Sequence, residues 1–384
     1  MFDFLFDYAA LRMIWWVLLG VLLIGFAVTD GFDMGVGALL PFVARTDAER
    51  RVAINTIGPV WEGNQVWFIL GGGAIFAAWP ALYALSFSGF YLAMFLVLAA
   101  MILRPVGFKY RSKRPEARWR RNWDIALFIG GAVPALIFGV AVGNTLQGVP
   151  FHFTDDLRPI YEGTLFGLLN PLGLYCGVVS VAMIAMHGAA WLAFKAEGPV
   201  ADRAAGFGAK LGVATAALFA LGGVFVAFGL LGGYGVVGTQ DLAGPSNPLL
   251  KEVVAAPEAW LANYAAHPLL IVVPLLGLAG PLLAALGFAM RRDGPTFVAS
   301  ALGVVGIIAT VGVSMFPMIL PSSTNPAQSL TVFDASSSES TLRTMLIVTV
   351  IFLPIVLAYT TWVYKVLWGK VRQEDVEASG SAAY

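Results

Sequence analysis

Long apolar runs recur along the whole chain and are separated by short polar stretches. An α-helix rises 1.5 Å per residue, so about 20 apolar residues are needed to cross roughly 30 Å of hydrocarbon. The pattern predicts nine transmembrane helices, over residues 11–41, 54–78, 80–105, 122–146, 163–195, 203–233, 260–290, 296–319 and 338–368. The second is the weakest, because Glu62, Asn64 and Gln65 lower its hydropathy.

Lysine and arginine indicate how these helices are oriented, because both concentrate on the cytoplasmic side of membrane proteins. With the N-terminus outside, 19 of the 23 basic residues fall in inner loops or in the C-terminal tail. The outer segments then hold Arg12, Arg158, Lys251 and Arg343. We therefore expect the N-terminus outside and the C-terminus in the cytoplasm. The same distribution supports the second helix, since without it the basic stretch 104–121 would lie outside.

Composition agrees with an all-α polytopic membrane protein. Hydrophobic residues make up 59% of the chain and charged residues 12%, and the mean hydropathy is +0.80. A soluble chain of this composition would lack the polar surface that its core requires. The 23 basic and 23 acidic residues balance and leave no basic surface for nucleic acid. The single cysteine, Cys176, excludes an intramolecular disulfide and CxxC motifs.

Three carboxylates lie inside apolar runs: Asp30 and Asp33 in TDGFDMGVG, and Glu62 in WEGNQVW. A charge in hydrocarbon costs several kcal/mol, so such residues are candidates for ion or proton transfer. With the orientation given above, all three approach the cytoplasmic face. Asp30 and Asp33 are three residues apart and share a helix face. Glu62 is expected on a polar stripe with 3, 4, 3 spacing (Asn55, Gly58, Glu62 and Gln65), so that two stripes line an inlet.

A structural interpretation of the same acids stays open. They could lock helices together through interhelical hydrogen bonds, or pair with Arg104 at the inner end of the third helix. We expect Arg104 to pair with Asp33 or Asp124. Gly71, Gly72 and Gly73 are interpreted as a site of close helix packing.

Haem ligation by this chain is not expected. His152, His187 and His267 are scattered and no pair has metal-ligand spacing, whereas a haem needs axial ligands held on facing elements.

Longer motifs carry a family resemblance. They are TDGFDMGVG, GPVWEGNQVWF, FAAWPALYALSFSGFY, RPVGFKYRSK, GVAVGNTLQGVPF, LLNPLGLYCGVVSV, SNPLLKEVV, MFPMILPSST and SLTVFDASSS, in this order from Trp15 to about Tyr364. The chain thereby resembles subunit II of the bacterial cytochrome bd quinol oxidases, including the cyanide-insensitive branch. For the fold, the resemblance implies two four-helix bundles and a peripheral ninth helix. We assign 1–150 to a first bundle with a proton inlet, 151–325 to a second bundle, and 326–384 to the ninth helix and cytoplasmic tail.

For function, the resemblance implies a complex of the respiratory chain in the bacterial inner membrane that oxidises quinol, reduces dioxygen to water and generates membrane potential. Haems b and d and the quinol-oxidising loop would belong to subunit I, the heterodimeric partner. Small single-span accessory subunits, membrane lipids and a bound quinone are further expected partners. The family's proton inlet carries over onto Glu62, with Asp33, Arg104 and Asp124 nearby and Gln65 and water as a local relay.

Two other functions remain as alternatives. A proton-coupled secondary transporter also places acids within the membrane, but it would use paired repeats and broken helices at the midplane. A purely structural scaffold for subunit I would have the same fold. It differs in that neutralising Glu62 would leave turnover intact.

Overall fold

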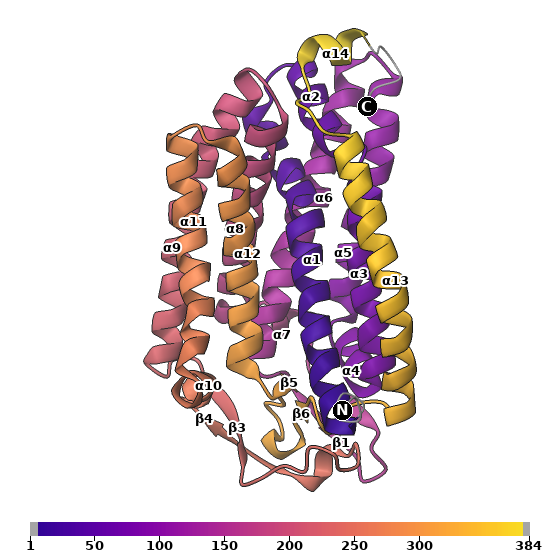
Figure 1. The fold of residues 1–384 in the computed structure, drawn as a ribbon, viewed down its shortest axis with the longest axis vertical. Coiled ribbons are helices and arrows are strands. Elements are labelled where there is room, and N and C mark those ends of the chain that lie inside the picture. The colour runs from indigo at the N-terminus through magenta and orange to yellow at the C-terminus, as the bar shows by residue number, and fades with distance from the viewer. Residues whose placement is uncertain (1–6, 379–384) are drawn as a thin grey trace.

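The computed structural model describes residues 7–378 and shows long helices standing side by side, with short strands gathered at one end (Figure 1). The helices are α1 (Tyr8–Val43), α2 (Asp47–Ile57), α3 (Trp61–Ala78), α4 (Pro80–Gly89), α5 (Tyr91–Tyr110), α6 (Ala117–Gln147), α7 (Leu165–Leu168), α8 (Pro171–Lys195), α9 (Pro199–Ala227), α10 (Ala262–Ala266), α11 (Val272–Ala289), α12 (Asp293–Met315), α13 (Glu339–Val366) and α14 (Gln373–Ala378). The strands are β1 (Phe151–Phe153), β2 (Pro159–Tyr161), β3 (Gly233–Val237), β4 (Glu252–Ala256), β5 (Met318–Leu320) and β6 (Leu330–Thr331).

Within residues 7–378, eight helices are long and apolar enough to cross a membrane: α1, α5, α6, α8, α9, α11, α12 and α13. The chain is therefore a multi-pass membrane protein. α3 packs against α1 but is not in this set, because its first turn carries Glu62, Asn64 and Gln65. Together with α3, these helices account for the nine predicted crossings.

Four of the predicted helices are interrupted, so their continuity was predicted wrongly. The fifth divides into α7 and α8, and the seventh divides at His267, between α10 and the helix that ends at Ala289. The second divides into α2 and α3 around Pro59, because proline has no N–H to donate and disfavours helix in the residue before it. The third divides at Phe90 into α4 and α5. There Gly89 lies so close to the ring of Tyr161 that a Cβ atom would come within 2.5 Å of it. Contact with β2 therefore shapes this bend, and hydropathy carries no signal for it.

The long helices form two groups of four. In the first group α1 packs against α3 and α6, and α6 packs against α5; in the second, α8 packs against α9 and α12, and α11 against both. α8 also packs against α1 and α6 and so joins the groups. A Cβ on Gly35 of α1 would lie 2.2 Å from the carbonyl oxygen of Ile184 on α8, and Gly188 is equally close to Gly35. Small residues permit this approach of two membrane helices.

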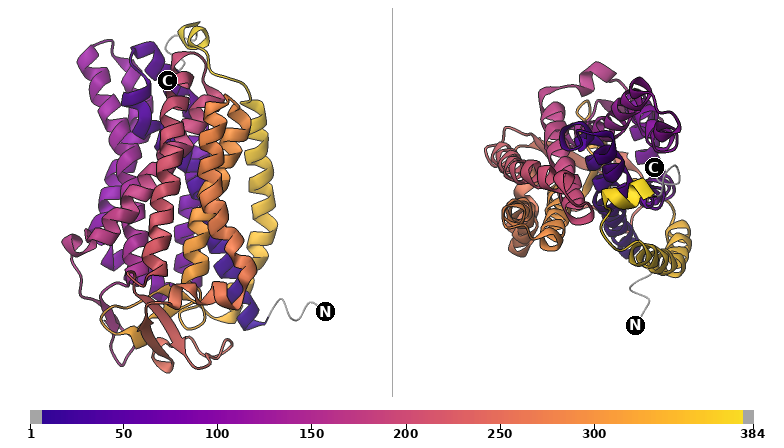
Figure 2. Two further views of the ribbon diagram at one scale, coloured as in Figure 1. Left: turned by 90° about the vertical axis from the view of Figure 1, so that its left-hand side faces the viewer. Right: turned by 90° about the horizontal axis from the view of Figure 1, so that it is seen from above.

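The two ends of the bundle differ. Three two-stranded antiparallel sheets, β1 with β2, β3 with β4, and β5 with β6, lie at the end where α1 begins. At the opposite end α14 packs on α2 (Figure 2). By the distribution of basic residues the strands lie outside and α2 and α14 lie in the cytoplasm. α13 stands at the edge of the bundle, where it contacts α1 and α3.

Candidate functional site

A buried ion pair joins α1 to α5. Asp30 and Arg104 are 0% and 2% exposed. Arg104 donates from Nη1 to Asp30 Oδ2 at 2.9 Å and from Nη2 to Asp30 Oδ1 at 2.7 Å. This bidentate arrangement is the strong form of an arginine–carboxylate contact. We had expected Arg104 to pair with Asp33 or Asp124, but its hydrogen bonds go to Asp30. The three-residue spacing puts Asp30 and Asp33 on one helix face, so the placement of α5 relative to α1 determines which of them Arg104 binds.

Asp33 lies next to this pair and is 1% exposed. Its Oδ2 is 3.9 Å from Arg104 Nη2, at the limit of an ion pair. The same Oδ2 accepts a hydrogen bond of 2.8 Å from Asn64 Nδ2 on α3. Asn64 Oδ1 in turn accepts one of 2.6 Å from the hydroxyl of Tyr364 on α13. The cluster therefore joins four helices that are distant in sequence.

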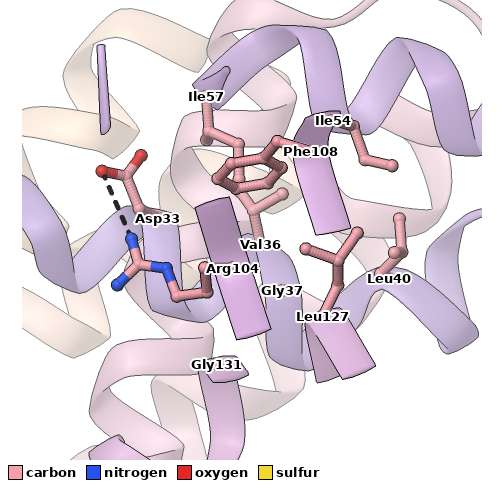
Figure 3. Close-up of a pocket in the computed structure, with 10 residues that line it drawn as sticks. All are labelled: Asp33, Val36, Gly37, Leu40, Ile54, Ile57, Arg104, Phe108, Leu127 and Gly131. Carbon is pink, nitrogen blue, oxygen red and sulfur yellow. Dashed lines mark ion pairs between the residues drawn. The ribbon is translucent and has the colours of Figure 1, made fainter. Parts of the chain in front are cut away.

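Asp33 Oδ1 and Arg104 Nε are buried and have no hydrogen-bond partner within residues 7–378. Both residues line a small cavity whose other walls are apolar residues or glycines of α1, α2, α5 and α6, including Val36, Ile57 and Leu127 (Figure 3). The space open to the centre of a water molecule is about 10 Å³, which is roughly what one water needs. The cavity is almost entirely apolar, and its two charged lining residues are an acid and a base that each have a buried atom without a partner in residues 7–378.

Asp124 belongs to a separate network nearer the cytoplasm, so its expected pairing with Arg104 was wrong. It accepts from Arg111 Nε at 2.5 Å and from Arg50 Nη1 at 2.7 Å. Arg111 also donates to Asp47 at 2.9 Å. These contacts hold α2, α6 and the turn after α5 together, because Arg111 and Asp124 are buried and each needs an opposite charge.

Glu62 is exposed on the first turn of α3 and lies apart from the buried cluster. Within the described residues nothing pairs with it. Side chains two positions apart on an α-helix point to nearly opposite sides. Asn64 faces Asp33, so Glu62 faces outward. The predicted polar stripe is wrong, because Asn55 and Gly58 lie before the break at Pro59. Gln65 is partly buried on the same helix.

The outward face of α3 is open in this chain. Val66, Ile69, Gly73 and Phe76 follow Glu62 at helical spacing, and all four are exposed. Nothing lies within 4 Å of a Cβ built on Gly71, Gly72 or Gly73. The expected helix packing at these glycines therefore does not occur between the helices of residues 7–378.

Sequence reasoning missed Asn64 and Tyr364 as members of the cluster. Asn64 carried a signal, since a polar residue opposite Glu62 must be buried if Glu62 faces outward. Tyr364 carried none, because a tyrosine near the end of a membrane helix is common at the interface.

The three histidines lie in different surroundings. His187 is fully buried, its Nδ1 is 2.8 Å from Ser300 Oγ, and its Nε2 is 2.8 Å from the carbonyl oxygen of Val28. Both ring nitrogens are thus occupied. His152 lies 2.9 Å from Glu162, and His267 is exposed at the end of α10. In residues 7–378 no group of three or more His, Cys, Asp or Glu side chains is placed to hold a metal ion.

Comparison with known proteins gives a consistent result. The family model for cytochrome bd terminal oxidase subunit II matches residues 11–367. The chain is 51% identical to cytochrome bd-I ubiquinol oxidase subunit 2 of Escherichia coli K12, over 98% of this chain and 100% of that protein. It is 30% identical to cytochrome bd ubiquinol oxidase subunit 2 of Bacillus subtilis, over 96% of this chain and 98% of that protein.

A solved structure shares the fold. The bd oxidase from Geobacillus thermodenitrificans contains a chain that matches with a TM-score of 0.67 at 15% identity, covering 93% of this chain and 98% of the other. The arrangement of helices is therefore one that a bd oxidase is known to have.

Proposed function

This chain belongs to the family of cytochrome bd terminal oxidase subunit II, and from that premise we propose that it conducts protons from the cytoplasm toward the oxygen-reducing site of a quinol oxidase. As a subunit II it is part of a haem-containing terminal oxidase and has a subunit I partner. It is not catalytic alone. Reduction of dioxygen consumes protons, and the polar groups that reach into this chain from the cytoplasmic end supply a route for them.

One observation carries the proposal: the buried cluster holds two carboxylates and a single guanidinium. Asp30 is neutralised by Arg104, which leaves Asp33 with one oxygen bonded to Asn64 and one oxygen that has no partner among the residues the structure describes. An uncompensated buried charge is costly. A proton that exchanges through the adjacent one-water cavity would relieve that cost, and this is the property a proton relay requires.

Glu62 acts in this proposal at the boundary with subunit I. Its carboxylate is on the open face of α3, where it can meet polar groups of another chain. That face is apolar beyond Glu62 and is lined by glycine, so it suits a tightly packed partner helix. Gln65, on the same helix, and water would complete the local relay. Asp124 holds the cytoplasmic mouth in place through Arg50 and Arg111.

The remaining assignments follow from the family. Subunit I would hold haems b and d, because the histidines of this chain do not fit axial ligation. The complex would lie in the bacterial inner membrane, with small single-span accessory subunits and lipids around it and a quinone bound as a structural element. We retain 1–150, 151–325 and 326–384 as the proposed division into a first bundle, a second bundle, and a peripheral helix with its tail.

A scaffold role is the second candidate, and the position of Glu62 favours it. The first turn of a helix stabilises a carboxylate through the helix dipole, so Glu62 would persist there without carrying protons. A secondary transporter is less well supported, because the buried acids Asp30 and Asp33 lie in the first group of helices alone.

Glu62→Gln separates relay from scaffold. Glutamine keeps the size and hydrogen bonding of glutamate but exchanges no proton. We expect quinol-driven oxygen uptake to fall at least about tenfold, since removing a proton-transfer group typically costs more than that. Haem content should stay normal, and Glu62→Asp should retain part of the activity. Uptake at the wild-type rate with intact haems would refute the relay and leave the scaffold.

A further inference from the structure

Tyr364 reaches from the periphery into the buried cluster. α13 is the outermost long helix, and the apolar stretch that lets it span a membrane is not buried in this chain. Tyr364 is an exception on that helix: its ring meets Trp191 edge to face, with 6.2 Å between ring centroids. Its hydroxyl donates to Asn64 Oδ1 at 2.6 Å. A peripheral helix thus places one hydroxyl at an inner amide.

The chemistry of these groups fixes how Asn64 is oriented. The phenol donates to the amide oxygen, so the amide NH₂ is turned toward α1 and donates to Asp33 Oδ2. Oδ2 is therefore an acceptor. A proton carried by Asp33 then sits on Oδ1, which has no hydrogen-bond partner in the described chain. Asp33 is also one of the residues that line the cavity.

Within residues 7–378 no other side chain donates a hydrogen bond to the Asp33 carboxylate. Both Nη atoms of Arg104 donate to Asp30, and the nearer one is 3.9 Å from Asp33. From α2 and α6, the walls of the cavity bring only apolar side chains and glycine. The amide of Asn64 is therefore the group that holds the carboxylate.

We infer that Asn64 and Tyr364 are positioning residues for Asp33: they occupy Oδ2, so that Oδ1, which has no other partner in the described chain, takes and releases the exchangeable proton. This inference rests on the proposed proton route. Tyr364 acts through Asn64, and Asn64 acts through Asp33.

Tyr364→Phe tests the hydrogen bond from Tyr364 to Asn64, because it removes the hydroxyl and keeps the ring against Trp191. Without that hydroxyl the amide can turn, and Oδ2 loses its donor for part of the time. We expect oxygen uptake per haem to fall on the order of threefold to tenfold, as suits one neutral hydrogen bond. Tyr359→Phe, on an exposed part of the same helix, should respire at the wild-type rate.

Infrared difference spectroscopy measures the carbonyl stretching frequency of protonated Asp33, which general destabilisation of the complex would leave unchanged. The carbonyl band of protonated Asp33 is identified by its loss in Asp33→Asn. Because Oδ2 is then the carbonyl oxygen, that band should move to higher frequency in Tyr364→Phe and in Asn64→Leu. The double variant should be no slower than Asn64→Leu alone, since both changes act on one atom.

The outcomes are distinguishable. If Asp33→Asn itself respires at the wild-type rate, the proton route through Asp33 fails. If Asp33→Asn is slow while Tyr364→Phe matches wild type in rate and in band position, the route stands and the positioning role is overturned. Additive losses in the double variant would also overturn it.

Discussion

Charge is buried near both ends of the helices, and the outer Lys251–Asp334 pair differs from the inner cluster of Asp30, Asp33 and Arg104. At the outer end Lys251 Nζ and Asp334 Oδ2 lie 2.6 Å apart, and each side chain is 5% exposed. Asp334 also accepts hydrogen bonds from Gln240 Nε2 and the Thr331 amide, so both of its oxygens are used. Burial lowers the pKa of Lys251, and Asp334 opposes that shift. Here one acid meets one base.

Arg12 adds to the closed character of the outer end. It is fully buried, and its Nε donates to Ser336 while its two Nη groups donate to the carbonyl oxygens of Leu242 and Gly244. These bonds tie the loop after β3 to α1 and to the segment before α13. Each of the charged groups named here has a fixed partner, which suits a structural seal. Among the neutral groups, Gln240 Oε1 is buried without a hydrogen-bond partner in residues 7–378.

At the inner end two acids share one base. Asp33 Oδ1 and Arg104 Nε have no partner in the described chain, and a cavity adjoins them. Burial of charge is thus common to both regions. The inner cluster differs in its mismatch of charge and in the cavity that its residues line, and these are the features on which the proposed function rests.

The largest expected effect comes from breaking the inner pair. Arg104→Ala leaves two carboxylates buried without a cation, which costs about 3–5 kcal/mol when one partner of a buried pair is removed. We expect little assembled complex, measured as haem per membrane protein after purification. Arg291→Ala removes an exposed arginine from the same face and should assemble normally. Normal assembly of Arg104→Ala would mean that Arg104 is not needed to hold Asp30.

The outer pair should tolerate joint replacement. Lys251→Met or Asp334→Leu alone strands a buried charge and should lower the thermal midpoint of the complex. The double variant should recover most of the loss, because replacing both members of a buried pair by apolar residues is often neutral. Its oxygen uptake per haem should equal that of the wild type. Lost uptake in a well-assembled double variant would show that the outer region is more than a seal.

A smaller effect is expected at Glu49, in the cytoplasmic helix α2. Burial alone would raise its pKa, but hydrogen bonds from Arg203 and from the Arg45 and Thr46 amides outweigh that and lower it below the ordinary 4.5. A lowered pKa stabilises the fold above that value, and the contribution is lost as pH falls through the lowered pKa. Glu49→Gln should reduce Tm at neutral pH by the equivalent of less than about 1 kcal/mol. This difference should vanish under strong acid, and a difference that is constant with pH would argue against an ionic contribution.

Most of the fold could be predicted from hydropathy and charge, because crossing a bilayer demands apolar length. Hydropathy did not predict the helix breaks at Pro59 and Phe90. The proline is a sequence signal for the first break, whereas the second lies where Gly89 contacts Tyr161, a residue distant in sequence. Within the site, the sequence located Asp30 and Asp33 on one face. Which of the two pairs with Arg104 could not be predicted, because helical periodicity gives the direction of a side chain and not its distance from a residue on another helix.

Side-chain contacts between segments distant in sequence could not be predicted from the sequence. Asn64 and Tyr364 are 300 residues apart and meet only after α13 has packed beside α3. Lys251 and Asp334 lie in two outer loops whose polar composition predicted only connecting segments. In each case the partner is chosen by tertiary packing, for which no local pattern exists.

In the proposed function, the inner cluster of Asp30, Asp33 and Arg104 exchanges protons, whereas the outer pair of Lys251 and Asp334 does not. The most direct measurement is quinol-driven oxygen uptake per haem for two matched variants, Asp33→Asn and Asp334→Asn. Each removes one buried carboxylate and preserves its shape. We predict a fall of at least about tenfold for Asp33→Asn and near wild-type turnover for Asp334→Asn in the complex that assembles. Wild-type turnover of Asp33→Asn, or equal losses in both variants, would contradict the claim.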